Sequence, residues 1–350
     1  MSRHGTVGLD ATIGAADAQG TKPLQPDSVY SLFSLTKAFV NVLILAAVDA
    51  GRIALTTRVA DIIPEFTGMP RDAVTVYHLL THTTGMPGVW TPRPGMYEDD
   101  LSELVAAVCE RVHGAVPPGE RCDFAPVANH VLMGEILRRT DPEGRDFGTI
   151  LQDDLFAPLG MTSTSMGVRP DLADRKVVPD TRGIIPIEVK GRAKPGPYSL
   201  FEVESNEAAH VGACSSVADI WTFAEMLRCG GSTGTARTLS PRILDMATRN
   251  HTGDLPNELY RAVALRAGWT PPPAYIGLGF SVWGPRLVHH QFGTMTSERT
   301  FGNYGAGSTM FWVDPEFGVT FVCLTTGLLP QAQNIERFQR LSDLAMAAVA

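Results

Sequence analysis

Residues 30–48 read YSLFSLTKAFVNVLILAAV, and this stretch decides the fold because a polar Ser-x-x-Lys pair stands directly before a long apolar run. A helix brings positions i and i+3 onto one face, so we expect the Ser34 hydroxyl and the Lys37 amine to lie side by side. A serine needs an adjacent base to become a good nucleophile, and a desolvated lysine can lose its proton and act as that base. Residues 38–48 are apolar on nearly every side, which predicts a helix buried all round. On spacing alone, a polar first turn with Ser34 near the helix cap is an equal alternative.

The composition is that of an ordinary globular protein, with 350 residues of which 44% are hydrophobic and 19% charged. A chain of this length predicts two structural units and a large core. The net charge of −8 gives no electrostatic support to a nucleic-acid or acidic-membrane role. The sequence has no window of about 20 unbroken apolar residues, so no membrane span is expected.

The sequence favours a cytoplasmic protein. Its opening, MSRHGTVGLDATIG, lacks the positive start and apolar stretch of a signal peptide. The five cysteines are odd in number and show no CxxC spacing, which disfavours a disulfide framework or a zinc site. We interpret them as buried free thiols in a reducing environment.

Hydrophobic patterning divides the chain into sheet-forming ends and a helical middle. Segment 5–33 predicts two short strands joined by a turn, and the aromatic and β-branched runs after about residue 277 predict an antiparallel sheet. Segment 52–100 contains five prolines and is interpreted as irregular. Helices are predicted over residues 101–112, 127–140, 146–160, 215–231 and 334–349.

Six further segments follow one another in the order found in a known enzyme family. They are VYHLLTHTTGMP (76–87), PGERCDF (118–124), HVLMGEIL (130–137), APLGMTSTSM (157–166), CSSVADIWTFAEMLRCGG (214–231) and FGNYGAGSTMFWVDPEFG (301–318). Together with the Ser-x-x-Lys pair they resemble the penicillin-recognising serine enzymes, in the branch of class C β-lactamases, family VIII esterases and related acyltransferases. The resemblance runs from about residue 28 to 327 and so covers nearly the whole chain.

The resemblance implies a fold of α/β plus all-α type. One part would be an antiparallel sheet flanked by helices, built from residues 1–60 and 207–350. The other part would be an inserted, mainly helical domain of residues 61–206, with the active site between the two. The Ser-x-x-Lys serine would stand at a helix N-terminus, where backbone N–H groups and the helix dipole favour negative charge.

By the same resemblance, Ser34 is the acylated nucleophile, and Lys37 is its base and proton relay. The oxyanion of acyl transfer needs fixed donors, which the family takes from backbone N–H groups, here those of Ser34 and Ala306. Gly305 and Gly307 would let the substrate approach this strand closely. The resemblance implies no cofactor and no metal.

Two motifs depart from the family pattern. The family has a tyrosine whose oxygen shares the base work and protonates the leaving group, whereas this chain has Phe124, followed by Ala125 and Pro126. General acid–base groups contribute about 10²- to 10⁴-fold to a rate, so the site should be slow unless another group substitutes. The family places Lys or His where Asn303 stands, and an amide brings no charge for the carboxylate of a β-lactam. Phe124 and Asn303 are therefore expected to line a substrate site that works poorly on β-lactams.

Several residues are candidates for the missing oxygen. Tyr304 follows Asn303, but strand side chains alternate between faces, so the two should not both point into the site. Tyr77 and Tyr275 lie in segments without a clear pattern. An engineered change of Tyr to Phe124, made to trap a complex, is a further alternative.

Three histidines have both a functional and a structural interpretation. His78 and His82 are spaced i, i+4 as zinc ligands can be, but the segment lacks the glutamate of an H-E-x-x-H motif. The resemblance places both in a structural turn beside the site. His130 begins a helix near Phe124, where helix packing is favoured over a proton-transfer role.

The first hypothesis is a serine acyl-transfer enzyme that works through an acyl-Ser34 intermediate on a small ester, thioester or amide. The acceptor would be water, or a bound amine or alcohol. Transfer to such an acceptor would make the enzyme a transacylase or cyclase of the kind used in secondary metabolism. The second hypothesis is a binding module or non-covalent catalyst that has lost hydrolysis. Retention of both Ser34 and Lys37 favours the first. Segments 88–100 and 180–210 are expected to shape the pocket.

Overall fold

The structure is a computed structural model that describes residues 1–182, 187–234 and 236–349. Within them, an antiparallel six-stranded sheet has the order β2-β1-β9-β8-β7-β6, and a three-stranded sheet has the order β3-β5-β4. The strands are β1 (Ser2–Arg3), β2 (Thr6–Val7), β3 (Tyr30–Ser31), β4 (Ser165–Met166), β5 (Ala213–Ser215), β6 (Ser281–Val282), β7 (Phe301–Gly305), β8 (Thr309–Asp314) and β9 (Val319–Cys323).

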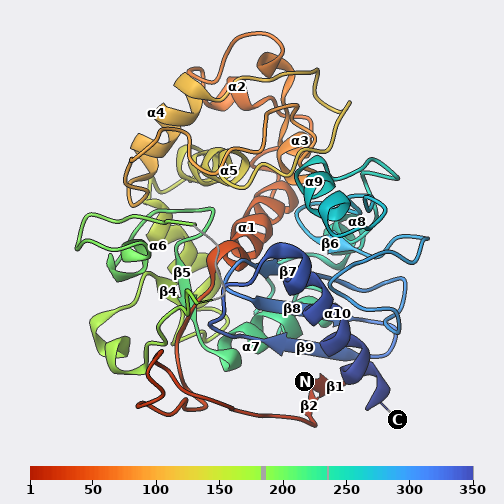
Figure 1. The fold of residues 1–350 in the computed structure, drawn as a ribbon. Helices are drawn as coiled ribbons and strands as arrows, with labels where there is room; N and C mark the ends of the chain where they lie inside the picture. Colours follow the sequence, from red (N-terminus) through yellow and green to blue (C-terminus); the bar gives the residue numbers. More distant parts are fainter. Residues whose placement is uncertain (183–186, 235, 350) are drawn as a thin grey trace.

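Helices surround this sheet and form a separate group beyond α1 (Figure 1). The α-helices are α1 (Lys37–Asp49), α2 (Val59–Ile62), α3 (Val76–Leu80), α4 (Leu101–Arg111), α5 (Ala128–Arg139), α6 (Phe147–Leu151), α7 (Val217–Arg228), α8 (Pro241–Ala247), α9 (Glu258–Arg266) and α10 (Gln331–Ala347). Short 3-10 and π-helical turns are η1 (Phe33–Thr36), η2 (Arg71–Ala73), η3 (Gln152–Phe156), η4 (Pro170–Arg175) and η5 (Ser199–Glu202). Helices α2 to α5 gather on one side of α1, and the large sheet lies on the other.

The central strand β8 explains why the large sheet is covered on both faces. Side chains along a strand alternate between faces. Met310 and Trp312 pack in one apolar cluster with Phe338 of α10. Phe311 points to the opposite face, where its ring meets the ring of Phe223 in α7 edge-on at a centroid distance of 5.6 Å. An antiparallel sheet flanked by helices is therefore confirmed.

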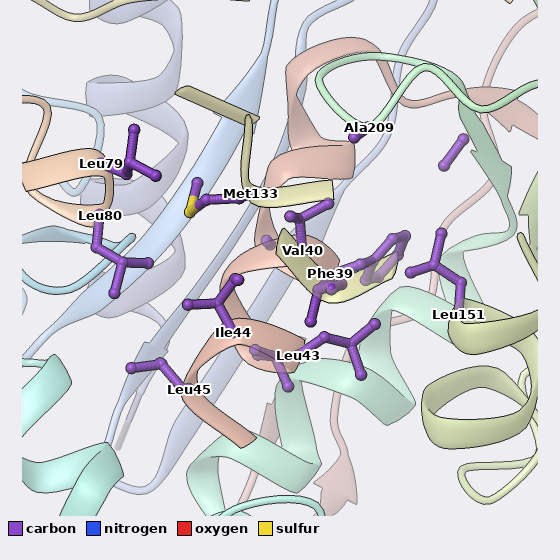
Figure 2. Close-up of a cluster of buried hydrophobic side chains, with 14 of the residues drawn as sticks. Phe39, Val40, Leu43, Ile44, Leu45, Leu79, Leu80, Met133, Leu151 and Ala209 are labelled. Carbon is purple, nitrogen blue, oxygen red and sulfur yellow. The ribbon is translucent and has the colours of Figure 1, made fainter. Parts of the chain in front are cut away.

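Helix α1 passes through the middle of the molecule and is packed on every side (Figure 1). Each of residues 38–45 is at most 1% exposed. Figure 2 shows side chains of α1 directed toward α3 on one side and toward Leu151 of α6 on another. The ring of Phe39 meets the rings of Phe156 and Phe223 edge-on at 5.1 and 5.0 Å between centroids. The predicted helix buried all round is confirmed.

Phe39→Ala is expected to destabilise the fold strongly, because the ring fills the centre of this cluster. Truncation of a buried phenylalanine costs about 3–5 kcal/mol in the free energy of unfolding. Leu344 on α10 is 68% exposed, and Leu344→Ala should change the same quantity by less than about 0.5 kcal/mol. Urea unfolding of both variants measures the difference, and similar losses in the two would contradict the central place of Phe39.

Some predicted elements differ from the observed ones. The strands at the start of the chain are only two residues long, and β1 and β3 pair with the distant β9 and β5. Such strands depend on remote partners, so a local pattern over 5–33 cannot place them. The predicted helix over 146–160 is interrupted, because α6 gives way to the π-helical turn η3. The C-terminal helix begins at Gln331, three residues before its predicted start.

Other features were missed because their sequence signals are short. Helices α2 and α3 lie in segment 52–100, and with four and five residues they are too short to show a helical period. Helices α8 and α9 were not predicted.

Cys109, Cys122 and Cys214 are buried free thiols, whereas Cys229, which directly follows α7, is exposed and corrects that part of the prediction. Among the described residues, no helix combines the length and apolar character needed to cross a membrane.

Candidate active site

The Ser-x-x-Lys pair is held in a tight turn that opens α1. Phe33 has a left-handed backbone with φ of +52° and begins the 3-10 turn η1, which leads directly into α1. Lys37 Nζ and Ser34 Oγ lie 3.0 Å apart, so the two side chains meet as their spacing predicts. The capping position is Leu32, and no side chain caps this turn. The alternative of Ser34 as a capping residue is therefore not supported, and its hydroxyl is free to face the lysine.

Lys37 is placed in an environment that favours its neutral form. The residue is 3% exposed, and its Nζ also donates a hydrogen bond to the carbonyl oxygen of His210 at 2.6 Å. Burial lowers the pKa of Lys37 to about 7, against the opposing influence of the Glu98 charge. Around neutral pH a large fraction of the amine is unprotonated and able to accept the proton of the Ser34 hydroxyl.

Strand β7 packs tightly against the turn that carries Ser34. A Cβ at Gly305 would lie 2.3 Å from the backbone oxygen of Leu32, and one at Gly307 would lie 2.5 Å from the ring of Phe33. The space at these glycines is therefore filled by the nucleophile turn, which corrects the expectation that it is left for substrate. The close contact brings the end of β7 beside the start of α1.

Two backbone N–H groups beside this contact have no partner in the part of the chain that the structure describes. The N–H groups of Ser34 and Ala306 donate to no acceptor among the described residues. Ala306 directly follows β7 and lines the same cavity as Ser34. Two unpaired N–H groups at one cavity wall suit an oxygen that gains charge during acyl transfer.

Ser34 and Lys37 open into a cavity of about 910 Å³. Its lining includes Trp90 and Met96 from segment 88–100, and Val189 and Tyr198 from segment 180–210. The expectation that these two segments shape the pocket is confirmed for the part of them that the structure describes; positions 183–186 lie outside it. The volume suits a medium-sized organic molecule.

Phe124 lines the cavity, as the sequence analysis expects. Its ring is stacked on the imidazole of His82, with 4.2 Å between centroids and 21° between planes. The ring of Tyr260 in α9 lies 6.3 Å away on another side. The phenyl ring therefore keeps an aromatic place in the wall without offering a proton.

Asn303 also lines the cavity, and its amide is used within the protein. Its Nδ2 donates to the carbonyl oxygen of Gly279 at 3.1 Å, and Asn41 of α1 donates to the same oxygen at 2.6 Å. The Oδ1 of Asn303 is buried and has no partner among the described residues. Asn303 thus brings polarity but no positive charge to the wall.

The other tyrosines and histidines named from the sequence have varied positions. Tyr304 lines the cavity together with Asn303, because the cavity extends past β7 toward α10, and its hydroxyl is paired with that of Tyr260. Tyr77 and Tyr275 are not part of the cavity lining. His130 is buried in α5 and its Nε2 bonds to Oδ1 of Asn41 at 3.0 Å.

His78 and His82 do not converge on a common point. Nδ1 of His78 lies 2.9 Å from Oγ1 of Thr75 in the capping box of α3, whereas His82 faces Phe124. Within the described part of the chain, no group of three or more His, Cys, Asp or Glu side chains is arranged to hold a metal ion.

One polar pair in the cavity wall has no signal in the sequence. Nε2 of His210 lies 2.8 Å from Oε2 of Glu98, and the two side chains are 4% and 5% exposed. Both residues line the cavity, and the backbone oxygen of His210 is the one that receives the Lys37 bond. Because 112 positions separate the partners, no local motif links them.

Comparison with known proteins agrees with this geometry. The sequence profile of the β-lactamase family matches residues 1–345. Penicillin-binding protein 4 of Amycolatopsis lactamdurans is 28% identical over 248 residues, which cover 69% of this chain and 62% of that protein, less than two thirds of its length. The esterase/β-lactamase LipL of Mycobacterium tuberculosis is 25% identical over 349 residues, which cover 92% of this chain and 74% of LipL.

A solved structure shows the same fold at lower identity. EstCE1, described as a hydrolase with promiscuous acyltransferase activity, superposes with a TM-score of 0.75 at 17% identity, covering 97% of this chain and 91% of that one. The family profile spans nearly every residue, and the fold and the Ser-x-x-Lys turn agree with it. This chain therefore belongs to the β-lactamase family.

Proposed function

We propose that this protein is a serine acyl-transfer enzyme that forms an acyl-Ser34 intermediate with Lys37 as the base. The observation that carries this proposal is the distance of 3.0 Å between Ser34 Oγ and Lys37 Nζ, combined with a lysine pKa that burial lowers to about 7. A nucleophile and a base within hydrogen-bond reach, in a cavity that holds a substrate, are the basic parts of covalent catalysis.

The chemistry proceeds in two halves. In the first, Lys37 takes the proton of Ser34 Oγ while that oxygen attacks the substrate carbonyl carbon. The negative oxygen that results is held by the N–H groups of Ser34 and Ala306, and the leaving group departs with the proton from Lys37. In the second half, water or a bound amine or alcohol gives a proton to Lys37 as it attacks the acyl carbon, and Ser34 Oγ takes that proton as its bond to the acyl carbon breaks.

The cavity favours a substrate without a carboxylate near the reacting carbonyl. Asn303 presents an amide at the wall and no positive charge. Lys190, another lysine of the cavity wall, pairs with Glu188 at 2.5 Å. We therefore propose an ester, thioester or amide of a small, uncharged acyl group. The names of LipL and EstCE1 support esterase and acyltransferase chemistry.

Mass spectrometry of the intact protein tests the proposal. The chain is incubated with activated acyl esters, thioesters and a penicillin, and we expect a mass gain equal to one acyl group. Ser34→Ala should show no gain, whereas Ser281→Ala, which changes another serine of the cavity wall, should keep it. Absence of an adduct from every donor would instead favour the second hypothesis, a binding module or non-covalent catalyst.

A further inference from the structure

Acyl transfer from an unactivated ester places charge on the leaving group before Lys37 returns its proton, and none of the residues described so far stabilises that charge. The oxygen of the leaving group gains charge as its bond to carbon breaks, and a fixed donor at that point lowers the barrier. The aromatic side chain stacked in the wall is Phe124, which has no hydrogen to donate. A donor beside Phe124 would meet the requirement.

The imidazole of His82 is fixed in the tautomer that makes such a donor. Its Nδ1 receives hydrogen bonds from the backbone N–H of Ala125 at 3.2 Å and from Nδ2 of Asn129 at 3.0 Å. Nδ2 of Asn129 also donates to the carbonyl oxygen of Leu79 at 3.0 Å, which identifies it as the nitrogen of that amide. With two donors directed at Nδ1, the single hydrogen of a neutral imidazole must be on Nε2.

The Nε2–H of His82 is open to the cavity. His82 lines the cavity, and its Nε2 has no partner among the described residues. The unpartnered Nδ1 atoms of His130 and His210 are sealed from solvent, whereas Nε2 of His82 is not. Its ring lies 4.2 Å from that of Phe124, so the imidazole and the phenyl ring share one wall of the cavity.

His82 also occupies a strained position. Its backbone φ is +55°, in the left-handed region that residues with a Cβ seldom adopt. Such strain persists only where the surroundings impose it, and it is frequent at functional sites. Burial, together with the nearby Lys37 charge, lowers the pKa of His82 to about 3, so the ring stays neutral and keeps the hydrogen on Nε2 at working pH.

The other candidate donors around Lys37 and Phe124 are already engaged. Nε2 of His130 bonds to Asn41, and Nε2 of His210 bonds to Glu98. The hydroxyl of Tyr260 is paired with that of Tyr304. Of these groups, His82 is the one whose ring N–H meets no acceptor in the described chain.

We propose that His82 Nε2–H donates a hydrogen bond to the leaving-group atom and so replaces the aromatic hydroxyl that Phe124 lacks, an inference that rests on the proposed acyl transfer at Ser34. The proton of Ser34 Oγ passes to Lys37 Nζ as the oxygen bonds to carbon. When the bond to the leaving oxygen breaks, its electron pair stays on that oxygen, which takes the proton from Lys37. His82 stabilises the charge in between and keeps its own hydrogen.

His82→Asn withdraws this donor, because asparagine has no atom at the position of Nε2, and it also removes the ring stacked on Phe124. The Asn Oδ1 can accept from Ala125 and Asn129 in place of Nδ1, and asparagine tolerates a left-handed backbone. Two esters of one acyl group are compared, p-nitrophenyl butyrate and butyl butyrate, because p-nitrophenolate leaves without a donor and butoxide does not. The rate of acyl-Ser34 formation from butyl butyrate should fall about 100-fold, while that from p-nitrophenyl butyrate should be little changed. The exposed His113→Asn is the matched control and should change neither rate.

A second variant tests the proposal without altering His82. Phe124→Tyr introduces a hydroxyl where a donor is proposed to exist already, so it should raise the butyl ester rate only slightly in the unmodified chain. In the His82→Asn background the same change should restore most of the lost rate, a non-additive result expected of two groups with one role.

The outcomes separate this inference from the proposed function. Equal losses on both esters in His82→Asn, or a gain near 100-fold from Phe124→Tyr alone, would overturn the role of His82 and leave acylation of Ser34 intact. Acylation of the unmodified chain by the p-nitrophenyl ester and never by the butyl ester would also overturn the role of His82 while leaving acylation of Ser34 intact. Absence of acyl-Ser34 with both esters would overturn both proposals.

Discussion

A Lys37→Met protein is expected to form the acyl-Ser34 adduct about 10²- to 10⁴-fold more slowly than the unmodified chain. Methionine fills similar volume, but it cannot take the proton of Ser34, whose oxygen lies 3.0 Å from Nζ. Lys37→Arg is the informative companion, because a guanidinium stays protonated in proteins and should be equally slow. The time course of the adduct mass measures all three. Rapid acylation of either variant would show that another group is the base.

The pH dependence of the same reaction follows from the lowered pKa of Lys37. Because the neutral amine is the active form, the acylation rate should rise with pH through about 7 and then level off. The charged form of Lys37 opposes folding, because its pKa is about 7 in the folded protein and 10.5 in the unfolded chain. Between these two pH values the unfolded chain binds more protons, so the free energy of unfolding increases with pH. Lys37→Met should therefore unfold at a higher denaturant concentration than the unmodified protein at pH 6, with a gain that shrinks toward pH 10. A gain that stays constant with pH would contradict the assignment.

Gly305→Ala should reduce turnover by about 100-fold, although it adds a single methyl group remote from the leaving group. The added Cβ would lie 2.3 Å from the Leu32 oxygen and 2.6 Å from Oγ1 of Thr309. Oγ1 of Thr309 donates to that same Leu32 oxygen at 2.8 Å, so the turn and the strand cannot separate without losing this bond. The displacement would move the Ser34 and Ala306 N–H groups apart and weaken their hold on the oxyanion.

Gly327→Ala is the matched control for this prediction, since a Cβ there meets no atom within 4 Å and the position has no left-handed backbone. Its turnover with an activated ester and its unfolding temperature should both stay close to those of the unmodified protein. Full activity in Gly305→Ala would show that the contact between β7 and the nucleophile turn does not set the geometry of the oxyanion site.

The sequence predicted those features that depend on short spacings. The separation of three residues between Ser34 and Lys37 is a helical neighbour relation, and the two atoms meet. The alternating and aromatic runs near the C-terminus form β7 to β9 in one antiparallel sheet. In each case the interaction partners lie within one helix or in adjacent strands, where local periodicity carries the information.

Features that depend on contacts between distant segments were not predicted. Glu98 and His210 meet across 112 positions, and their pairing depends on how the cavity wall folds over α1. The free N–H of His82 depends on two donors from the segment that precedes and begins α5. Gly305 and Gly307 were predicted to give the substrate access, whereas their space is taken up by the turn that carries Ser34. A sequence does not distinguish a glycine needed for chain packing from one needed for ligand access.

The placement of Lys37 at the start of a helix buried on every side, with Ser34 in the turn that leads into it, has a consequence for evolution. Changes in α1 alter the core as well as the reactive pair, so this helix can vary little without loss of the folded protein. Part of the cavity lining comes instead from irregular segments that include Trp90 and Tyr198, and surface loops accept substitutions and insertions readily. New acyl specificities can therefore arise by exchange of these segments alone, and random libraries confined to segments 88–100 and 187–198 should yield altered selectivity at nearly constant stability.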